Sequence, residues 1–185
     1  MSTSGGTLEP DGPGLGIFTA SGVDVGAVGT LAGAVAEGNG NLFFVPFFSP
    51  KGGLLVAQMA CDVTVAGTAG SAIRLGIYDD GGAFAPSALL LDAGQIATGV
   101  TTGRQSITGL STQLAAGKLY WLACVTQGAP VTTPTLACIA PAGAQYSAAG
   151  APDNAYFQLG VTAALPGVAS GLNRNVSAPA VLVHT

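Results

Sequence analysis

The feature that most constrains the fold is the shortness of the apolar runs, which glycine, proline or polar residues interrupt every few positions. Two of these runs, 54–67 and 71–80, follow a period of two. That period places alternate side chains on opposite faces of a strand and is typical of a half-buried antiparallel sheet. In the run at 54–67 we expect one face to hold Leu55, Ala57, Met59, Cys61, Val63 and Val65. In the run at 71–80, Ile73, Leu75 and Ile77 should point inward, and Arg74 and Tyr78 should point outward.

A third run, at 42–48, is apolar on both of its sides. Phe43, Val45 and Phe47 lie on one side, and Phe44 and Phe48 lie on the other. A strand of this kind is either covered on both faces or lies at an interface. Pro46 lacks the N–H that a strand ladder needs, so we expect an edge or a bulge at that position.

Further strand-like segments raise the expected number of strands to about eight. They lie at 89–97, 104–110, 117–128, 135–140, 155–162 and 180–184. Residues 29–40 would form at most one or two helical turns, because glycine lies inside the segment and at both of its ends. We therefore predict an all-β chain, an antiparallel two-sheet β-sandwich or jelly roll. The expected organisation is an extended N-terminal arm at 1–22 followed by a β-sandwich domain at 23–185.

The surface is expected to be poor in charge, because charged residues make up 8% of the chain and apolar residues 49%. A typical soluble domain has about 25% charged residues. Such a surface favours association, and we expect other protein to cover much of it. A membrane helix is disfavoured because no apolar run approaches the roughly 20 residues it needs. The N-terminal stretch also lacks the basic start and apolar core of a secretory signal.

The charge and the cysteines narrow the function further. A formal net charge of −4, with five scattered Lys and Arg residues, argues against binding to nucleic acid. The three cysteines, Cys61, Cys124 and Cys138, leave one unpaired and follow no metal-ligand spacing. Because each lies in an apolar, strand-like run, we expect buried free thiols, as suits assembly in a reducing cytoplasm.

The stretch between two strands at 79–86 contains Asp79 and Asp80, two glycines and Pro86. Aspartates bond backbone amides in turns and glycine takes positive φ readily, so we expect a hairpin turn. Calcium is the alternative, but it needs about six to eight oxygen ligands, usually with several carboxylates at regular spacing. Two adjacent carboxylates do not meet that requirement, and no metal site is predicted.

No catalytic constellation is evident in the sequence. The single histidine, His184, lies beside the C-terminus, where a base for a nucleophile is poorly held. A glycosidase would need two facing carboxylates, and no context marks such a pair among the acidic residues. These are Glu9, Asp11, Asp24, Glu37, Asp62, Asp79, Asp80, Asp92 and Asp153. No nucleotide or zinc motif is present, so we expect neither an enzyme nor a cofactor.

Glycan binding is harder to dismiss, because sugar-binding sandwiches present flat aromatic side chains to their ligand. Trp121 shares a strand face with apolar residues, so we expect it in the core rather than on a binding platform. Tyr146, in a loop rich in glycine and alanine, is the best candidate for a glycan contact. The other aromatic residues considered are Tyr78, Tyr120 and Tyr156.

Four segments together resemble a known family. They are "NLFFVPFFSP" at 41–50, "IRLGIYDD" at 73–80, "LLLDAGQIATG" at 89–99 and "ITGLSTQLAAGKLYWLACV" at 107–125. The resemblance, over roughly residues 41–127, is to a β-sandwich domain of tailed-bacteriophage virion proteins. Such domains occur in capsid decoration and head-fibre proteins and at the ends of minor tail proteins. Short strand motifs of this kind are also similar to those of bacterial carbohydrate-binding sandwiches. The resemblance implies no catalytic or glycan-binding residue.

The function that the resemblance implies is structural and non-enzymatic. We expect a capsid decoration or head-fibre subunit that binds and reinforces the outer capsid surface, in a virion assembled in the host cytoplasm. Its expected partners are the major capsid protein and copies of itself, as a homotrimer, because capsid lattices offer threefold positions. Neither nucleic acid nor a membrane is expected as a partner. The alternative is a minor tail or receptor-binding subunit that contacts host surface glycans.

Overall fold

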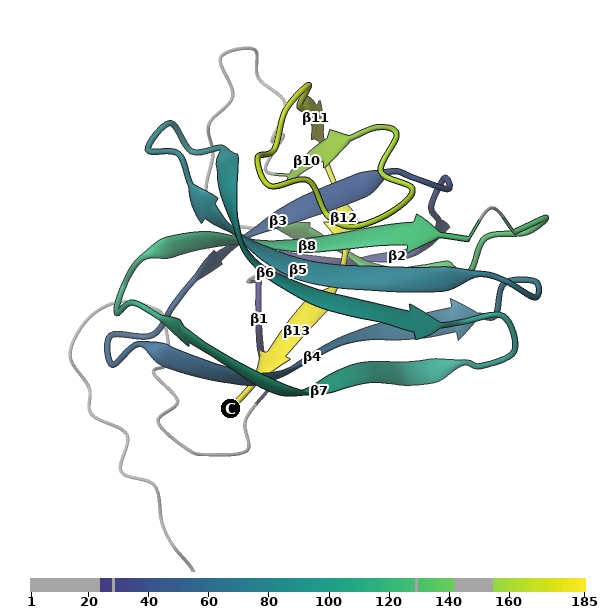
Figure 1. Ribbon diagram of the computed structural model, residues 1–185, viewed down its shortest axis with the longest axis horizontal. Coiled ribbons are helices and arrows are strands. Elements are labelled where there is room, and N and C mark those ends of the chain that lie inside the picture. Colours follow the sequence, from purple (N-terminus) through teal and green to yellow (C-terminus); the bar gives the residue numbers. More distant parts are fainter. Residues whose placement is uncertain (1–23, 28, 129, 142–154) are drawn as a thin grey trace, which may run out of the picture.

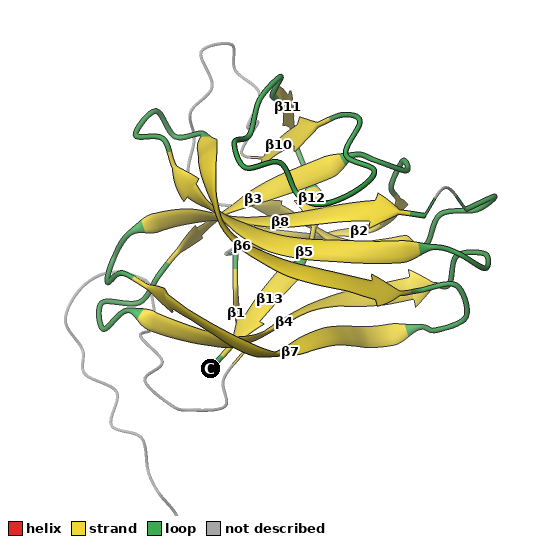
Figure 2. Cartoon of the chain, in the orientation of Figure 1, coloured by secondary structure: helices red, strands yellow, loops and turns green. Residues whose placement is uncertain are grey.

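The computed structural model describes residues 24–27, 29–128, 130–141 and 155–185. Within these residues the chain forms strands and loops and no helix (Figure 2). The strands make two antiparallel sheets that pack against each other, which confirms the predicted all-β sandwich. The predicted N-terminal arm, at 1–22, lies outside the described residues. No described helix is long and apolar enough to cross a membrane.

The six-stranded sheet has the order β11–β10–β3–β8–β5–β6. Its strands are β3 (Leu42–Phe48), β5 (Ala72–Asp80), β6 (Pro86–Ala97), β8 (Leu119–Gln127), β10 (Ala155–Gln158) and β11 (Asn173–Asn175). β10 pairs with only the first three residues of β3, whereas β8 pairs along its whole length. Pro46 therefore lies in the half of β3 that has no described strand on its β10 side, in agreement with the expected edge.

The seven-stranded sheet is branched at β4, where β7 pairs on one edge and both β13 and β9 pair on the other. Its strands are β1 (Asp24–Gly26), β2 (Gly29–Ala36), β4 (Leu54–Val65), β7 (Gly103–Leu114), β9 (Thr135–Pro141), β12 (Ala178–Pro179) and β13 (Val181–His184). The chain passes at Ala180 from pairing with β9 to pairing with β4. β2 and β1 then extend the two branches beyond β9 and β13.

The main core lies between the sheets. Its members from the six-stranded sheet include Phe43, Val45, Phe47, Ile73, Leu75, Ile77, Tyr120, Leu122 and Cys124. The alternation predicted for β5 is thereby confirmed. The alternation predicted for β4 is correct from Met59 to Val63 but wrong at Val65, which is 57% exposed, and wrong before Met59, where the pairing with β7 is irregular between Val56 and Gln58. Val56 consequently packs in the core, and Leu55 is 49% exposed.

A second core lies on the outer face of the six-stranded sheet. Residues 159–172, here termed the cover segment, bury this face (Figure 1, the yellow-green loop after β10). The buried residues are Leu42, Phe44, Tyr78, Trp121, Ala123, Val125, Val161 and Leu165. At Leu42 and Phe44, β3 is therefore covered on both faces by its own chain, as the first of the two predicted alternatives has it, whereas Phe48 at its end is 55% exposed.

Specific contacts hold the cover segment in place. The Leu89 N–H donates to the carbonyl of Gly167 (2.9 Å), and the Ala169 N–H donates to that of Ser87 (2.8 Å). Leu165 lies above Gly76, where a Cβ atom would fall 2.3 Å from a Leu165 methyl carbon. A side chain at position 76 would therefore displace Leu165.

Two segments differ from the sequence predictions. Residues 29–36 form β2 rather than helical turns, because pairing with β9 satisfies their backbone groups. The segment predicted as one strand at 155–162 forms β10 as far as Gln158, after which it enters the cover segment. These and the short β1, β11 and β12 account for most of the difference between about eight predicted strands and the strands observed.

Candidate functional site

The turn between β5 and β6 is built by its two aspartates. The Asp80 carboxylate accepts hydrogen bonds from the N–H groups of Gly82 (2.9 Å) and Ala85 (3.1 Å). Asp79 forms an ion pair with Lys118 (2.7 Å). The predicted hairpin turn is confirmed. Among the described residues, no group of three His, Cys, Asp or Glu side chains could hold a metal ion.

Trp121 is the residue most like a glycan platform by type, and it is completely buried. Its indole N–H donates to Asp80 (3.0 Å), and its ring meets those of Phe84 and Tyr156 edge to face, with centroids 5.3 and 5.4 Å apart. The expectation that Trp121 is a core residue is confirmed, with the outer face of the sheet as its location. Tyr146, the predicted glycan contact, lies outside the described residues.

The other tyrosines that could serve as platforms are also packed into the protein. Tyr78 and Tyr120 are buried. The Tyr78 hydroxyl donates to the carbonyl of Pro166 (2.8 Å), and burial raises the pKa of this phenol. The Tyr156 hydroxyl donates to the carbonyl of Phe84 (3.2 Å). Tyr78 and Tyr156 therefore stabilise the outer core and Tyr120 the main core, and none of the three offers a flat exposed surface.

The six described acidic residues each have a contact of their own. Asp79 and Asp80 serve the turn, as above. The Arg74 Nε–H donates to both carboxylate oxygens of Asp92 (2.7 and 2.9 Å). Glu37 is buried and accepts a contact from the Cys138 thiol (3.7 Å), and desolvation raises its pKa above 4.5. The structure does not describe Glu9, Asp11 or Asp153.

A half-exposed ionic cluster connects β1, β13, β4 and β7 on the outer face of the seven-stranded sheet. Asp24 contacts Nδ1 of His184 (3.2 Å) and forms an ion pair with Arg104. Arg104 also lies 3.6 Å from Asp62. His184 is thus held by a carboxylate of the neighbouring strand β1.

The three cysteines are buried and free, as predicted. Burial raises the pKa of the Cys61 thiol to about 12 and that of Cys138 to about 11. The thiolate is the reactive form of cysteine, so these thiols are inert at neutral pH.

The surface feature that stands out is one end of the sandwich, here termed the uncharged end. It consists of the β4–β5 and β6–β7 loops, at 66–71 and 98–102, and the described residues of the β8–β9 loop, at 128 and 130–134. The three loops lie together at the right of Figure 1. None of the three loops contains Asp, Glu, Lys, Arg or His. Val100 is 88% exposed and Val131 is 96% exposed. Apolar side chains therefore project from loops that contain no charged residue, with Arg104 of β7 at their border.

Hydrogen bonds join the three loops. Gly67 donates to the carbonyl of Thr98 (3.1 Å), and Thr68 donates to that of Thr132 (3.0 Å). In return Thr132 donates its N–H to the Thr68 hydroxyl (3.1 Å). The loops thus form one connected surface rather than three independent tips.

Close backbone packing explains the glycines of these loops. A Cβ atom on Gly99 would lie 2.8 Å from the carbonyl oxygen of Thr68. A Cβ atom on Gly128 would lie 1.8 Å from the carbonyl oxygen of Gly70, and Gly128 also has a φ of +94°. Only glycine fits such positions, so the composition of the loops sets their mutual distance.

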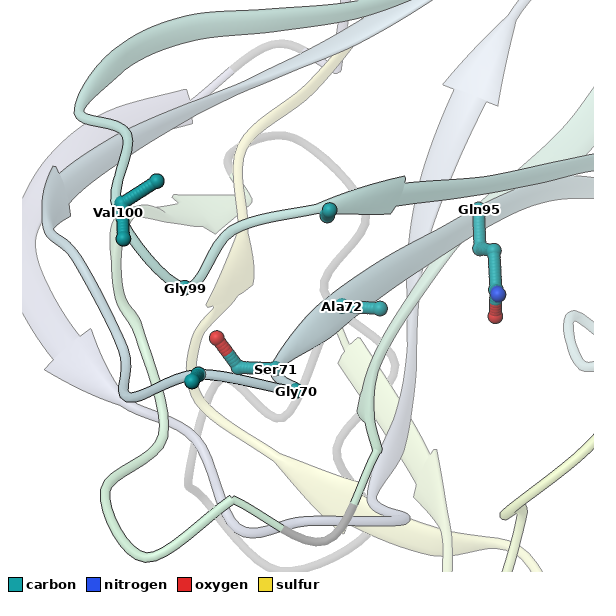
Figure 3. A pocket seen from close by; sticks show the side chains of 8 residues that line it. Gly70, Ser71, Ala72, Gln95, Gly99 and Val100 are labelled. Carbon is teal, nitrogen blue, oxygen red and sulfur yellow. The ribbon is translucent and has the colours of Figure 1, made fainter.

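A hollow of about 540 Å³ opens at the uncharged end, between the β4–β5 and β6–β7 loops (Figure 3). Small residues line it, and Gln95 supplies the largest polar side chain at its border. The lining residues are Ala69, Gly70, Ser71, Ala72, Gln95, Ala97, Gly99 and Val100. The Thr98 hydroxyl donates a hydrogen bond to the Ser71 hydroxyl (3.3 Å). The hollow makes the uncharged end concave at this point, and none of its lining residues is charged.

The opposite end of the sandwich is different in kind. Its loops, at 49–53, 81–85 and 115–118, lie at the left of Figure 1. Lys51 and Lys118 belong to them, and Asp79 and Asp80 border them. Sequence reasoning predicted a charge-poor surface but missed that the uncharged loops share one end, because only strand order shows which loops are neighbours.

No family model and no curated protein matches the chain. Among solved structures, it is similar to the cysteine protease and lectin-like domains of Cwp84, a surface layer associated protein of Clostridium difficile. The TM-score is 0.45 and the identity 11%, over 79% of this chain. The chain spans about a third (33%) of the length of that protein.

Proposed function

We propose that the chain is a non-enzymatic structural subunit of a tailed-phage virion, a capsid decoration or head-fibre protein that binds the outer capsid surface. The observation that carries the proposal is the uncharged end, with its exposed Val100 and Val131. Exposed apolar patches mark surfaces that meet other proteins. The resemblance of residues 41–127 to virion sandwich domains supplies the kind of partner.

The mechanism is association without chemistry. Two sheets with a core between them, and a second core under the cover segment, make a rigid body. Fully burying one valine side chain contributes about 1.5–3 kcal/mol. Contacts of this kind, repeated over many copies on a shell, would reinforce it. The described aromatic residues that might bind sugars are buried or packed against one another, which favours this proposal over the glycan-binding alternative.

The location is tested by immunogold electron microscopy of virions, with an antibody raised against this chain. Label spread over the head supports the proposal. Label confined to the tail tip would replace it with the receptor-binding alternative. Absence of label from all particles would overturn the virion assignment.

The contact surface is tested by binding of purified variants to capsids that lack the protein. We expect Val131→Lys to weaken binding at least about tenfold, since 1.4 kcal/mol corresponds to that factor. Leu55→Lys is the matched control, because Leu55 is 49% exposed and lies beside the 49–53 loop, at the opposite end of the sandwich. Equal effects of both variants would contradict the assignment of the uncharged end as the contact surface.

A further inference from the structure

Strand β2 is the exposed apolar element of the seven-stranded sheet. Its sequence, "GTLAGAVA" at 29–36, contains no charged residue and no proline. Each of the residues from Ala32 to Ala36 is exposed, and Val35 is 41% exposed. A strand normally buries at least one face. In this part of β2 both faces are open, although the side chains are apolar.

β2 also has an unpaired edge among the described residues. It pairs with β9 from Gly29↔Pro141 to Ala36↔Thr135, and no described strand lies on its other side. A strand paired on one side leaves a row of N–H and C=O groups available to another chain. The irregularity between Leu31 and Gly33 interrupts the ladder once, and the pairing is regular from Gly33 onward.

The other described edges carry features that hinder pairing. β1 and β11 have three residues each. β6 begins at Pro86, contains Asp92 and shifts its register against β5 three times. β7 contains Arg104 and pairs irregularly with β4, with extra residues between Thr108 and Thr112. Short strands, proline, charge and bulges are the usual protections of a sheet edge. β2 has only one of them.

We propose that β2 is a self-association edge, on which the β2 strand of a second copy of this chain adds antiparallel about a twofold axis. The inference rests on the proposed function in taking a copy of the chain as the partner. A twofold axis brings identical edges together, so each copy offers the other the same free backbone groups. Each copy has a net charge of −4, and β2 is a place where two copies meet without like charges.

The pairing would give one sheet that is continuous across two molecules. It would cover the alternate side chains of both β2 strands with those of the partner, at the cross-strand distances that stabilise sheets. It also defines the symmetry of the smallest unit. A twofold dimer replaces the homotrimer that the capsid lattice suggested, and higher assemblies would contain pairs of subunits.

The test is the molar mass of the full chain, measured by size-exclusion chromatography with light scattering over a range of concentrations. We expect wild type at twice 17.9 kDa and Val35→Lys at 17.9 kDa. Val168→Lys is the matched control, with the same change of charge at a valine that is 64% exposed in the cover segment, over the other sheet. It should remain a dimer. Circular dichroism and thermal unfolding check that Val35→Lys folds as wild type does.

Hydrogen exchange adds a readout at the strand itself. The amides of residues 33–36 should become more protected as the wild-type concentration rises, and not in Val35→Lys. A wild-type monomer, a trimer, or a Val35→Lys variant that stays dimeric would overturn the inference. A dimer that binds no capsid would instead overturn the proposed function and leave the dimer edge standing, whereas a capsid-binding monomer would do the reverse.

Discussion

The outer face of the six-stranded sheet is covered by the chain itself, whereas the outer face of the seven-stranded sheet carries polar side chains. On the first face, Trp121, Tyr78 and Phe44 lie completely buried beneath the cover segment. On the second, Gln58 donates to Ser106 (3.1 Å), and Arg104 contacts two aspartates. The difference follows from the alternate residues of each strand, which are apolar in β3 and β8 and largely polar in β4 and β7.

This comparison shows what the C-terminal third of the chain contributes. A sandwich needs only one core, between its sheets. Here the apolar outer face of the six-stranded sheet needs a second one, and the cover segment supplies it without regular secondary structure of its own. Its anchors are backbone hydrogen bonds to β6 and the carboxylate of Asp92. Four substitutions test how unequal the two faces are.

The largest effect is expected for Trp121→Ala. Removing a fully buried tryptophan leaves a cavity under the cover segment and an Asp80 carboxylate without its indole donor. We expect the free energy of unfolding to fall by about 3–5 kcal/mol, measured by urea denaturation. A loss below about 1 kcal/mol would mean that the cover segment does not pack on this face.

Leu165→Ala should lower the free energy of unfolding somewhat less, by about 2–4 kcal/mol, because the side chain is slightly exposed and its site above Gly76 can partly collapse. Hydrogen exchange should show faster exchange of amides in the cover segment, with β4 and β7 unaffected. Gly76→Ala provides an independent check, since a methyl group there would displace Leu165. Unchanged amide exchange in both variants would show that Leu165 does not hold the cover segment in place.

Asp92→Asn is expected to lower the free energy of unfolding by about 1–3 kcal/mol at neutral pH, because a half-buried charge-assisted contact is lost. Burial alone would raise the pKa of Asp92, but hydrogen bonds from Arg74, Leu165 and Gly94 outweigh it and hold the pKa below 3.8. A lowered native pKa stabilises the fold above the unfolded-state pKa. That stability is lost as the pH falls from about 4 through the native pKa.

The pH dependence separates this contact from simple packing. Wild type should lose stability on acidification below about pH 4 more steeply than Asp92→Asn does, as measured by urea denaturation at several pH values. The double variant with Arg74→Gln gives the coupling between the two side chains. Parallel pH profiles for wild type and Asp92→Asn would contradict the assigned role.

The smallest effect is expected for Arg104→Ala on the outer face of the seven-stranded sheet. The Arg104 side chain is 45% exposed, and exposed ion pairs contribute about 0–1 kcal/mol. Salt should reduce even that contribution. A loss comparable to that of Leu165→Ala, in thermal or urea unfolding, would show that the polar face is as strongly stabilised as the covered one and would remove the contrast.

The alternation of apolar and polar residues predicted the two-sheet fold, because it can be read from each strand without knowing that strand's neighbours. Ile73, Leu75 and Ile77 face the core as their spacing indicated. The same pattern failed at Leu55, because a bulge depends on how β4 is paired with β7 and not on β4 alone. β2 was missed for a similar reason. Its alanines and glycines have weak strand preference, and the hydrogen bonds with β9 hold it in the sheet.

The sequence by itself determined the sandwich class, the scarcity of surface charge, the buried thiols and the hairpin turn at Asp79 and Asp80. Each of these follows from residue type and short-range spacing. The tertiary structure was needed to place Trp121 beneath the cover segment, to bring three uncharged loops to one end and to leave β2 at an open edge. These features depend on contacts between residues far apart in the chain, and short-range spacing carries no information about such contacts.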